Sequence, residues 1–211
     1  MTERLKLVRR GFHLAVITVA WNLVEGVIAI ASGVLAGSVA LVGFGVDSFV
    51  EAASGTVIGW RFSYEIRGRS EELAEKAELW ASRVAGTLLL ILAVYLLIDS
   101  ARRLFGFGRK PDPSLPGIAL MILALAIMPI LARAKLKTAA GLGSKALRAD
   151  AYESVACAWL SATTLAGLVL NAAFGWWWAD PAAALVLIPF IVREGIESLR
   201  GECDEQEETS S

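Results

Sequence analysis

Two acidic residues, Asp47 and Glu51, stand four positions apart in the segment GFGVDSFVEAASG, whose other residues are apolar or small. On a helix this spacing places both carboxylates on one face, where like charges repel each other. If the helix lies in a lipid bilayer, each charge near its centre costs roughly 2.5–3.5 kcal/mol. A bound cation or a proton would offset that cost. The alternative is a protonated, hydrogen-bonded carboxyl pair with a purely structural role.

A second pair with the same spacing, Glu153 and Cys157, lies in the segment RADAYESVACAWL. If the helices that carry the two pairs face each other, three carboxylates and one sulfur can surround a divalent metal ion tetrahedrally. A carboxylate inside a membrane span is a functional candidate by default, whereas a single cysteine is as often a small packing residue. The sequence therefore predicts a metal site formed by Asp47, Glu51 and Glu153, with Cys157 as the fourth candidate ligand.

Three further polar residues could serve such a site. Glu25 lies midway along the first apolar segment with Asn22 about one turn before it, and Asp150 stands three residues before Glu153. Each could relay protons or support the ligands. Glu25 could equally be a hydrogen-bonded structural group, and the sequence does not choose between these roles.

The composition indicates the kind of structure that must position these residues. Hydrophobic residues make up 56% of the 211 residues, mean hydropathy is +0.59, and the charged residues gather in clusters. This apolar share exceeds that of an ordinary soluble domain. Six segments approach the roughly 20 residues that a bilayer requires. They are residues 12–34, 38–60, 83–100, 115–133, 150–171 and 179–199. We therefore predict an all-α, six-helix transmembrane bundle.

The first apolar segment is too long for a cleaved signal peptide, so we interpret it as the first span. The bundle is expected to occupy residues 1–201, followed by a short, acidic, disordered tail over residues 202–211 and no cytoplasmic domain. With six spans, the side that holds both termini carries 16 Lys and Arg residues and the opposite side 4. The positive-inside rule then predicts that both termini are cytoplasmic, in a protein of the plasma or inner membrane.

Two charged residues at the ends of spans have simpler explanations. Asp180 is followed by proline at the start of the sixth span and is expected to cap that helix. Asp99 stands beside Arg102 and Arg103, which predicts a local ion pair. No nucleophile–base set and no phosphate-binding glycine loop indicates an enzyme, and no basic patch with aromatic residues indicates nucleic-acid binding.

Three motifs in order carry a family resemblance: GSVALVGFGVDSFVE, KALRADAYESVAC, and GWWWADPAAALVL with EGIESL after it. Together with the six-span layout, from Asn22 to about Gly201, they resemble the cation diffusion facilitator family of metal transporters. In that family, two acidic residues of the second span and a His-x-x-x-Asp pair of the fifth bind the metal. The matching positions here are Asp47, Glu51, Glu153 and Cys157. Three of these four depart from the family's residue types.

The resemblance implies a divalent metal cation transporter that exchanges metal for protons by alternating access. Zinc is the first candidate substrate, with cadmium, manganese, iron and cobalt as alternatives. The family typically carries a cytoplasmic domain after the sixth span, so the resemblance is to a short branch with the transmembrane domain only, and a homodimer is an open question. One alternative is a non-transporting membrane metal sensor or regulatory partner with the same fold. Another is proton-coupled transport of a different solute.

Overall fold

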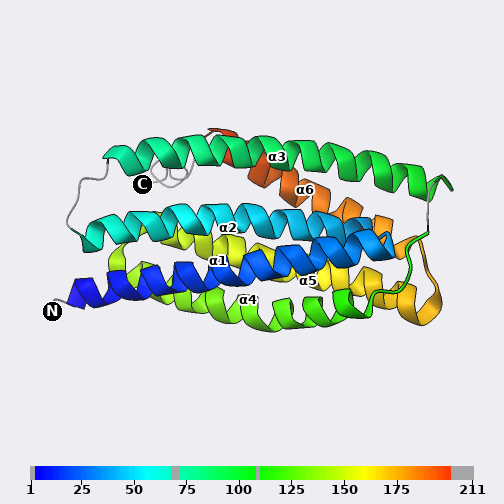
Figure 1. The fold of residues 1–211 in the computed structure, drawn as a ribbon, viewed down its shortest axis with the longest axis horizontal. Helices are drawn as coiled ribbons and strands as arrows, with labels where there is room; N and C mark the ends of the chain where they lie inside the picture. Colours follow the sequence, from blue (N-terminus) through cyan, green and yellow to red (C-terminus); the bar gives the residue numbers. More distant parts are fainter. Residues whose placement is uncertain (1–2, 68–71, 108–109, 201–211) are drawn as a thin grey trace, which may run out of the picture.

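The computed structural model describes residues 3–67, 72–107 and 110–200, and this part of the chain consists of helices and connections without a strand. The predicted all-α membrane bundle is confirmed (Figure 1). The elements in chain order are α1 (Glu3–Ala36), α2 (Val39–Ile66), α3 (Glu72–Leu104), α4 (Leu115–Leu142), α5 (Lys145–Phe174) and α6 (Ala179–Arg200). The predicted tail, residues 202–211, lies outside the described residues.

The helices are longer than the predicted spans. At about 1.5 Å per residue, a helix of 34 residues such as α1 is roughly 50 Å long, against a hydrocarbon core of about 30 Å. Within the described residues, α1, α2, α4 and the part of α5 from Asp150 onward are long and apolar enough to cross a membrane. Each of the six predicted spans falls within one helix, and most of the helices project well beyond them.

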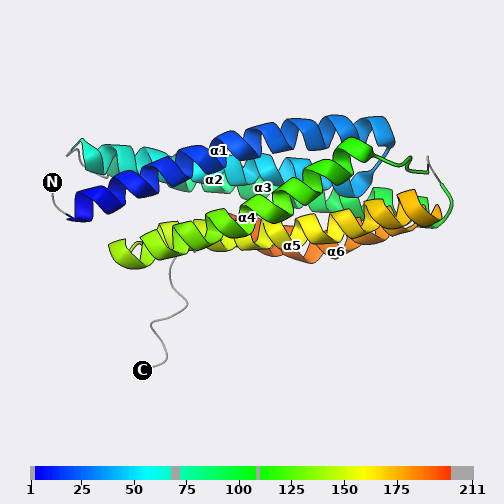
Figure 2. The same ribbon diagram turned by 90° about the horizontal axis from the view of Figure 1, so that it is seen from below.

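The six helices form three closely packed pairs, and α2, a member of one pair, also contacts the other two pairs. α1 packs mainly along α2, α4 along α5, and α3 along α6, while α2 also contacts α3, α5 and α6. In Figure 1, α3 and α6 lie together on one side of the bundle, and in the turned view of Figure 2, α4 and α5 lie on the opposite side from the N-terminal part of α1. The central place of α2 brings its buried residues against several neighbours at once.

The outer surface of the bundle is apolar as well as its interior. Side chains that are at least half exposed include Val24, Val27, Leu35, Ile91 and Ile130. A soluble protein rarely presents so many apolar side chains to water. Such a surface is the one that a bilayer would cover, in agreement with an integral membrane protein.

Glycine allows α1 and α2 to touch backbone to backbone. A Cβ added at Gly45 would lie 2.9 Å from the backbone nitrogen of Ile30, and one added at Gly26 would lie 3.0 Å from the carbonyl oxygen of Gly45. Only a residue without a Cβ fits such a contact, which is typical of membrane helix pairs. Because of this close approach, Glu25 of α1 reaches the buried residues of α2.

Asp180 does not cap its own helix, so that expectation is wrong. It lies within the first turn of α6, and its carboxylate accepts a hydrogen bond from the Ser38 hydroxyl and another, of 2.9 Å, from the backbone N–H of Val39. Asp180 thus caps the N-terminus of α2. Nearby, Arg103 pairs with Asp99 at 2.8 Å, as expected, and also donates to the carbonyl oxygen of Gly37. We refer to Ser38, Val39, Asp99, Arg103 and Asp180 as the end cluster.

Candidate functional site

The α2–α5 interface brings together the two predicted pairs of ligands. Asp47 and Glu51 are 5% and 3% exposed, Cys157 is 2% exposed, and Glu153 is half-buried. Residue spacing explains this, since positions four apart on each helix share a face and these faces meet.

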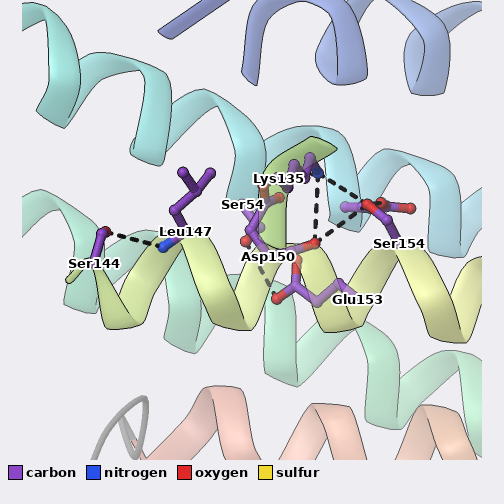
Figure 3. A network of polar contacts seen from close by, with 8 residues as sticks. Ser54, Lys135, Ser144, Leu147, Asp150, Glu153 and Ser154 are labelled. Carbon is purple, nitrogen blue, oxygen red and sulfur yellow. Dashed lines mark hydrogen bonds and ion pairs between the residues drawn. The ribbon is translucent and has the colours of Figure 1, made fainter. Parts of the chain in front are cut away.

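Serine side chains link each helix to a carboxylate of the other. The Ser154 hydroxyl of α5 donates to Glu51 Oε1 of α2 at 2.8 Å. In the other direction, the Ser54 hydroxyl of α2 donates to Glu153 Oε1 at 3.3 Å, as Figure 3 shows. Each of these two glutamates therefore has one oxygen held by a serine of the facing helix.

Cys157 lies on the same interface. It is a buried free cysteine, one turn beyond Glu153 on α5. Cys157 also belongs to the cluster of buried apolar residues that includes Phe44, Val50 and Leu160, so the packing role and the ligand role that the sequence left open both stay predictions.

Three carboxyl oxygens in this region are buried without a partner. Asp47 Oδ1, Glu51 Oε2 and Glu25 Oε1 have no hydrogen-bond partner among the described residues. The Asp47 carboxyl also lies near enough to Glu25, Glu51 and Glu153 to feel their charges. Buried polar atoms in proteins almost always have a partner, so each exception needs an explanation. A proton or a cation can supply it.

The donors are not yet arranged around one point. Among the described residues, no three His, Cys, Asp or Glu side chains converge closely enough to hold a metal ion. The arrangement has the composition of a cation site, and binding would require these side chains to rotate or α2 and α5 to approach each other. The ligand role of the four residues stays a prediction.

On α1, a polar strip faces α2 next to this region. Thr18, Asn22 and Glu25 are fully buried and share one helix face. The Ser48 hydroxyl of α2 is 3.3 Å from Glu25 Oε2, whereas both amide atoms of Asn22 and the Thr18 hydroxyl have no partner in the described part of the chain. The strip is therefore polar enough to hold water or protons beside the carboxylates.

Lys135 belongs to the site, although the sequence interpretation counted it among the cytoplasmic loop charges. That assignment is wrong, because Lys135 lies within α4 and is fully buried. Its ammonium is 2.7 Å from Asp150 Oδ2 and donates to the Ser154 hydroxyl at 2.9 Å (Figure 3). A signal was present in the sequence, since Lys135 continues the buried stripe of α4 that includes Met121, Met128 and Leu131.

Comparison with known proteins identifies the family. Residues 15–202 match the cation efflux transmembrane domain. The chain belongs to this family. An uncharacterized transporter of Synechocystis sp. is 29% identical over 174 residues, which cover 81% of this chain and 56% of that protein. The chain thus spans just over half the length of the curated relative that it matches.

Proposed function

We propose that this cation efflux family member transports a divalent metal cation across the membrane in exchange for protons, with zinc or a similar ion as substrate. The observation that carries the proposal is the pair of unpartnered, buried carboxyl oxygens on Asp47 and Glu51, facing Glu153 and Cys157 of α5. Ionisable groups inside a membrane protein are costly and usually mark the path of an ion or proton.

The chemistry of the four donors couples the binding of a metal ion to the release of protons. Carboxylate and thiolate bind a metal ion only when they are deprotonated, so metal entry displaces protons and protons displace metal. Three carboxylates and a thiolate together carry more negative charge than a divalent ion can balance. A buried site therefore retains a proton on one of them even with the metal bound.

The serine contacts suggest how each glutamate would meet the ion. Glu51 Oε1 is held by Ser154 and Glu153 Oε1 by Ser54, and Glu51 Oε2 is left to meet a cation. Closer approach of α2 and α5 would bring this oxygen together with Asp47 and Cys157. Alternating access would then be a rearrangement of helices around this site.

The donor types limit which metal ions the site would prefer. A thiolate favours Zn²⁺ or Cd²⁺, whereas a site rich in carboxylates and without imidazole favours Mn²⁺, Fe²⁺ or Co²⁺. We take Zn²⁺ as the first candidate because Cys157 would supply a thiolate, and the other four ions as competitors in the test.

The orientation proposed here is the one that the Lys and Arg distribution predicts, with both termini in the cytoplasm and the helices in the plasma or inner membrane. Burial of Lys135 removes one charge from the cytoplasmic total and leaves the bias in place. A membrane-impermeant maleimide should label Cys203 in a Cys157→Ala background only in inside-out vesicles. Labelling of right-side-out vesicles would reverse the proposed orientation.

Flux in proteoliposomes tests the function directly. The wild type and the variants Asp47→Ala, Glu153→Ala and Asp112→Ala would be reconstituted and supplied with Zn²⁺, Cd²⁺, Mn²⁺, Fe²⁺ or Co²⁺ under a proton gradient. Asp112 is an exposed carboxylate outside the helices and serves as the matched control. We expect the wild type and the control to move at least one ion and the two site variants to move none.

Two results would count against this proposal. If the wild type moves no ion but binds one, a membrane metal sensor or regulatory partner becomes the better description. If Asp47→Ala and Glu153→Ala transport like the wild type, the cation crosses elsewhere and the carboxylates between α2 and α5 have a structural role.

A further inference from the structure

Lys135 contacts Ser154 in addition to its ion pair with Asp150. Both side chains of that pair are fully buried, with 2.7 Å between Lys135 Nζ and Asp150 Oδ2. A buried ammonium needs such a counter-ion, because an unpaired charge would be expensive there. The ion pair balances the charge, and the ammonium's other N–H donors bond Ser154 Oγ at 2.9 Å and the Asp150 carbonyl oxygen at 3.5 Å. The additional hydrogen bond to Ser154 connects Lys135 with the candidate site.

Ser154 is the relay between the ammonium and Glu51. Lys135 Nζ donates to Ser154 Oγ at 2.9 Å, and Ser154 Oγ donates to Glu51 Oε1 at 2.8 Å. A hydroxyl has a single proton, and Ser154 has a second acceptor, the carbonyl oxygen of Asp150, at 3.2 Å. Because the ammonium occupies the hydroxyl's oxygen, the proton of Ser154 must point away from Lys135, and Glu51 is the nearer acceptor. Donation by a cation also makes the hydroxyl a stronger donor.

We propose that Lys135, acting through Ser154, is a positioning residue that fixes the orientation of the Glu51 carboxyl. With Oε1 on Ser154, the unpartnered Oε2 is the oxygen left for a cation. This inference rests on the proposed function, since it assigns Glu51 to a cation site. It makes α4, which carries none of the four predicted ligands, a supporting element of that site. Figure 3 shows Lys135 reaching both Asp150 and Ser154 on α5.

The surroundings of Lys135 agree with this role. Asp150 and Ser154 of α5 are its direct partners, and Glu51 of α2 is the carboxylate beyond them. α2 also approaches this pair, because a Cβ added at Gly55 would lie 4.0 Å from Asp150 Oδ1 and 3.1 Å from Val19 Cγ2. The ammonium is thus enclosed between three helices. Its charge is balanced by Asp150, which leaves the Glu51 carboxylate available to an incoming ion.

The experiment separates positioning of Glu51 from stability of the fold. Ser154→Ala removes the relay and keeps the ion pair, while the double variant Lys135→Met/Asp150→Asn removes the relay's anchor without leaving a buried unpaired charge. Thr163→Val is the matched control, because within the described part of the chain the Thr163 hydroxyl donates to the carbonyl oxygen of Trp159 on its own helix and to no other helix. Ser154→Thr keeps the hydroxyl and tests rescue. Each purified protein would be titrated with Zn²⁺ by calorimetry, and its melting temperature would be measured without metal.

We expect Ser154→Ala and the double variant to raise the Kd for Zn²⁺ by about 10- to 100-fold, the usual effect of losing a residue that supports a metal ligand. Ser154→Ala leaves a Lys135 N–H and Glu51 Oε1 without a partner, so its metal-free melting temperature should fall, whereas that of the double variant should stay near the wild type. Ser154→Thr and Thr163→Val should keep the wild-type Kd. An unchanged Kd in Ser154→Ala would overturn the inference, whatever the double variant does, because the ion pair is then purely structural.

The same titration distinguishes this inference from the proposed function. A wild type that binds Zn²⁺ but does not transport it removes the transport proposal, and the Kd ratios still decide the role of Lys135. A wild type that binds none of Zn²⁺, Cd²⁺, Mn²⁺, Fe²⁺ and Co²⁺ removes the cation site and this inference with it.

Discussion

Acidic side chains are buried in two regions of the bundle, and the two regions differ in how many hydrogen-bond partners they give to the carboxylates. In the end cluster, the Asp180 carboxylate accepts from the Ser38 hydroxyl and the Val39 N–H. Between α2 and α5, Asp47 and Glu51 each keep one carboxyl oxygen without a partner in the described residues. Both oxygens of the Asp180 carboxylate thus have hydrogen-bond donors, whereas Asp47 and Glu51 each have an oxygen that lacks one.

Position along the helix explains the difference. Asp180 meets the first turn of α2, where backbone N–H groups have no intrahelical partner and the helix dipole favours an anion. Asp47 and Glu51 lie in the interior of α2, where the N–H groups are already used by the helix itself. A carboxylate in the second environment must find a side chain, a proton or a cation. Burial of an acid therefore signals function only where the backbone cannot satisfy it.

The largest expected effect on transport comes from removing the charge of Asp47 at the α2–α5 interface. Asp47→Asn should lower transport of the preferred ion by at least about 100-fold, beyond the usual effect of losing a residue that only supports a ligand. Its melting temperature should stay equal or rise, because a buried charge without a full set of partners is removed. Flux in proteoliposomes and thermal unfolding in detergent measure the two quantities. Retained flux with a lower melting temperature would make Asp47 a structural residue like Asp180.

The opposite pattern is expected in the end cluster. Asp180→Ala leaves the Ser38 hydroxyl and the Val39 N–H without their acceptor, which should lower the free energy of unfolding by about 1–3 kcal/mol. The apparent KM for the transported ion should not change. Asp180→Asn keeps an acceptor oxygen and should lose less stability. Denaturant titration of the purified protein checks the first value, and a raised KM with full stability would contradict the comparison.

A smaller change should follow from altering the sulfur alone. Cys157→Ser replaces a soft donor with a hard one of similar size, so affinity for Cd²⁺ should fall relative to Mn²⁺ by roughly tenfold, about 1.4 kcal/mol. Competition titrations with the two ions give this ratio. The thiolate-to-cadmium charge-transfer absorption should be present in the wild type and lost in the variant. An unchanged ratio would assign Cys157 to packing.

The smallest effect is expected from Arg103. Its ion pair with Asp99 is largely buried, with side chains 15% and 23% exposed, and Arg103 also donates to the carbonyl oxygen of Gly37, so Arg103→Met should cost about 1 kcal/mol. Transport should keep both its KM and its kcat, because Arg103 lies in the end cluster. Thermal unfolding and flux would be compared with those of Arg102→Met, whose side chain is exposed in the same turn. Loss of transport in Arg103→Met would show that the two regions are coupled.

Patterns within one helix made most of the architecture predictable from the sequence. The long apolar segments indicated the six-helix membrane bundle, and the i, i+4 spacing placed Asp47 with Glu51 and Glu153 with Cys157. Both pairs do lie on the α2–α5 interface. Their role as ligands is still a prediction, since spacing along one helix does not determine how side chains of two helices converge.

What the sequence could not supply were partners from other helices. Lys135 stands among basic residues and looks like part of a loop, and its burial depends on α4 continuing to Leu142 and on Asp150 of the next helix. Asp180 fits the local pattern of a cap, but the N-terminus that it caps belongs to α2, 141 residues earlier at Val39. Local rules identified both residues as polar outliers and could not name the group that each one meets.

The short connection between α4 and α5 has a consequence for how the protein enters the bilayer. α4 is followed by its C-cap Gly143, which has the left-handed conformation, and α5 starts directly after its N-cap Ser144. Lys135 and Asp150 therefore face each other across a tight helical hairpin. Their charges can cancel as soon as these two helices meet, before the other helices are in place. The hairpin can then be delivered to the lipid as a unit with a neutral interior, which spares the insertion machinery a solitary ammonium and a solitary carboxylate.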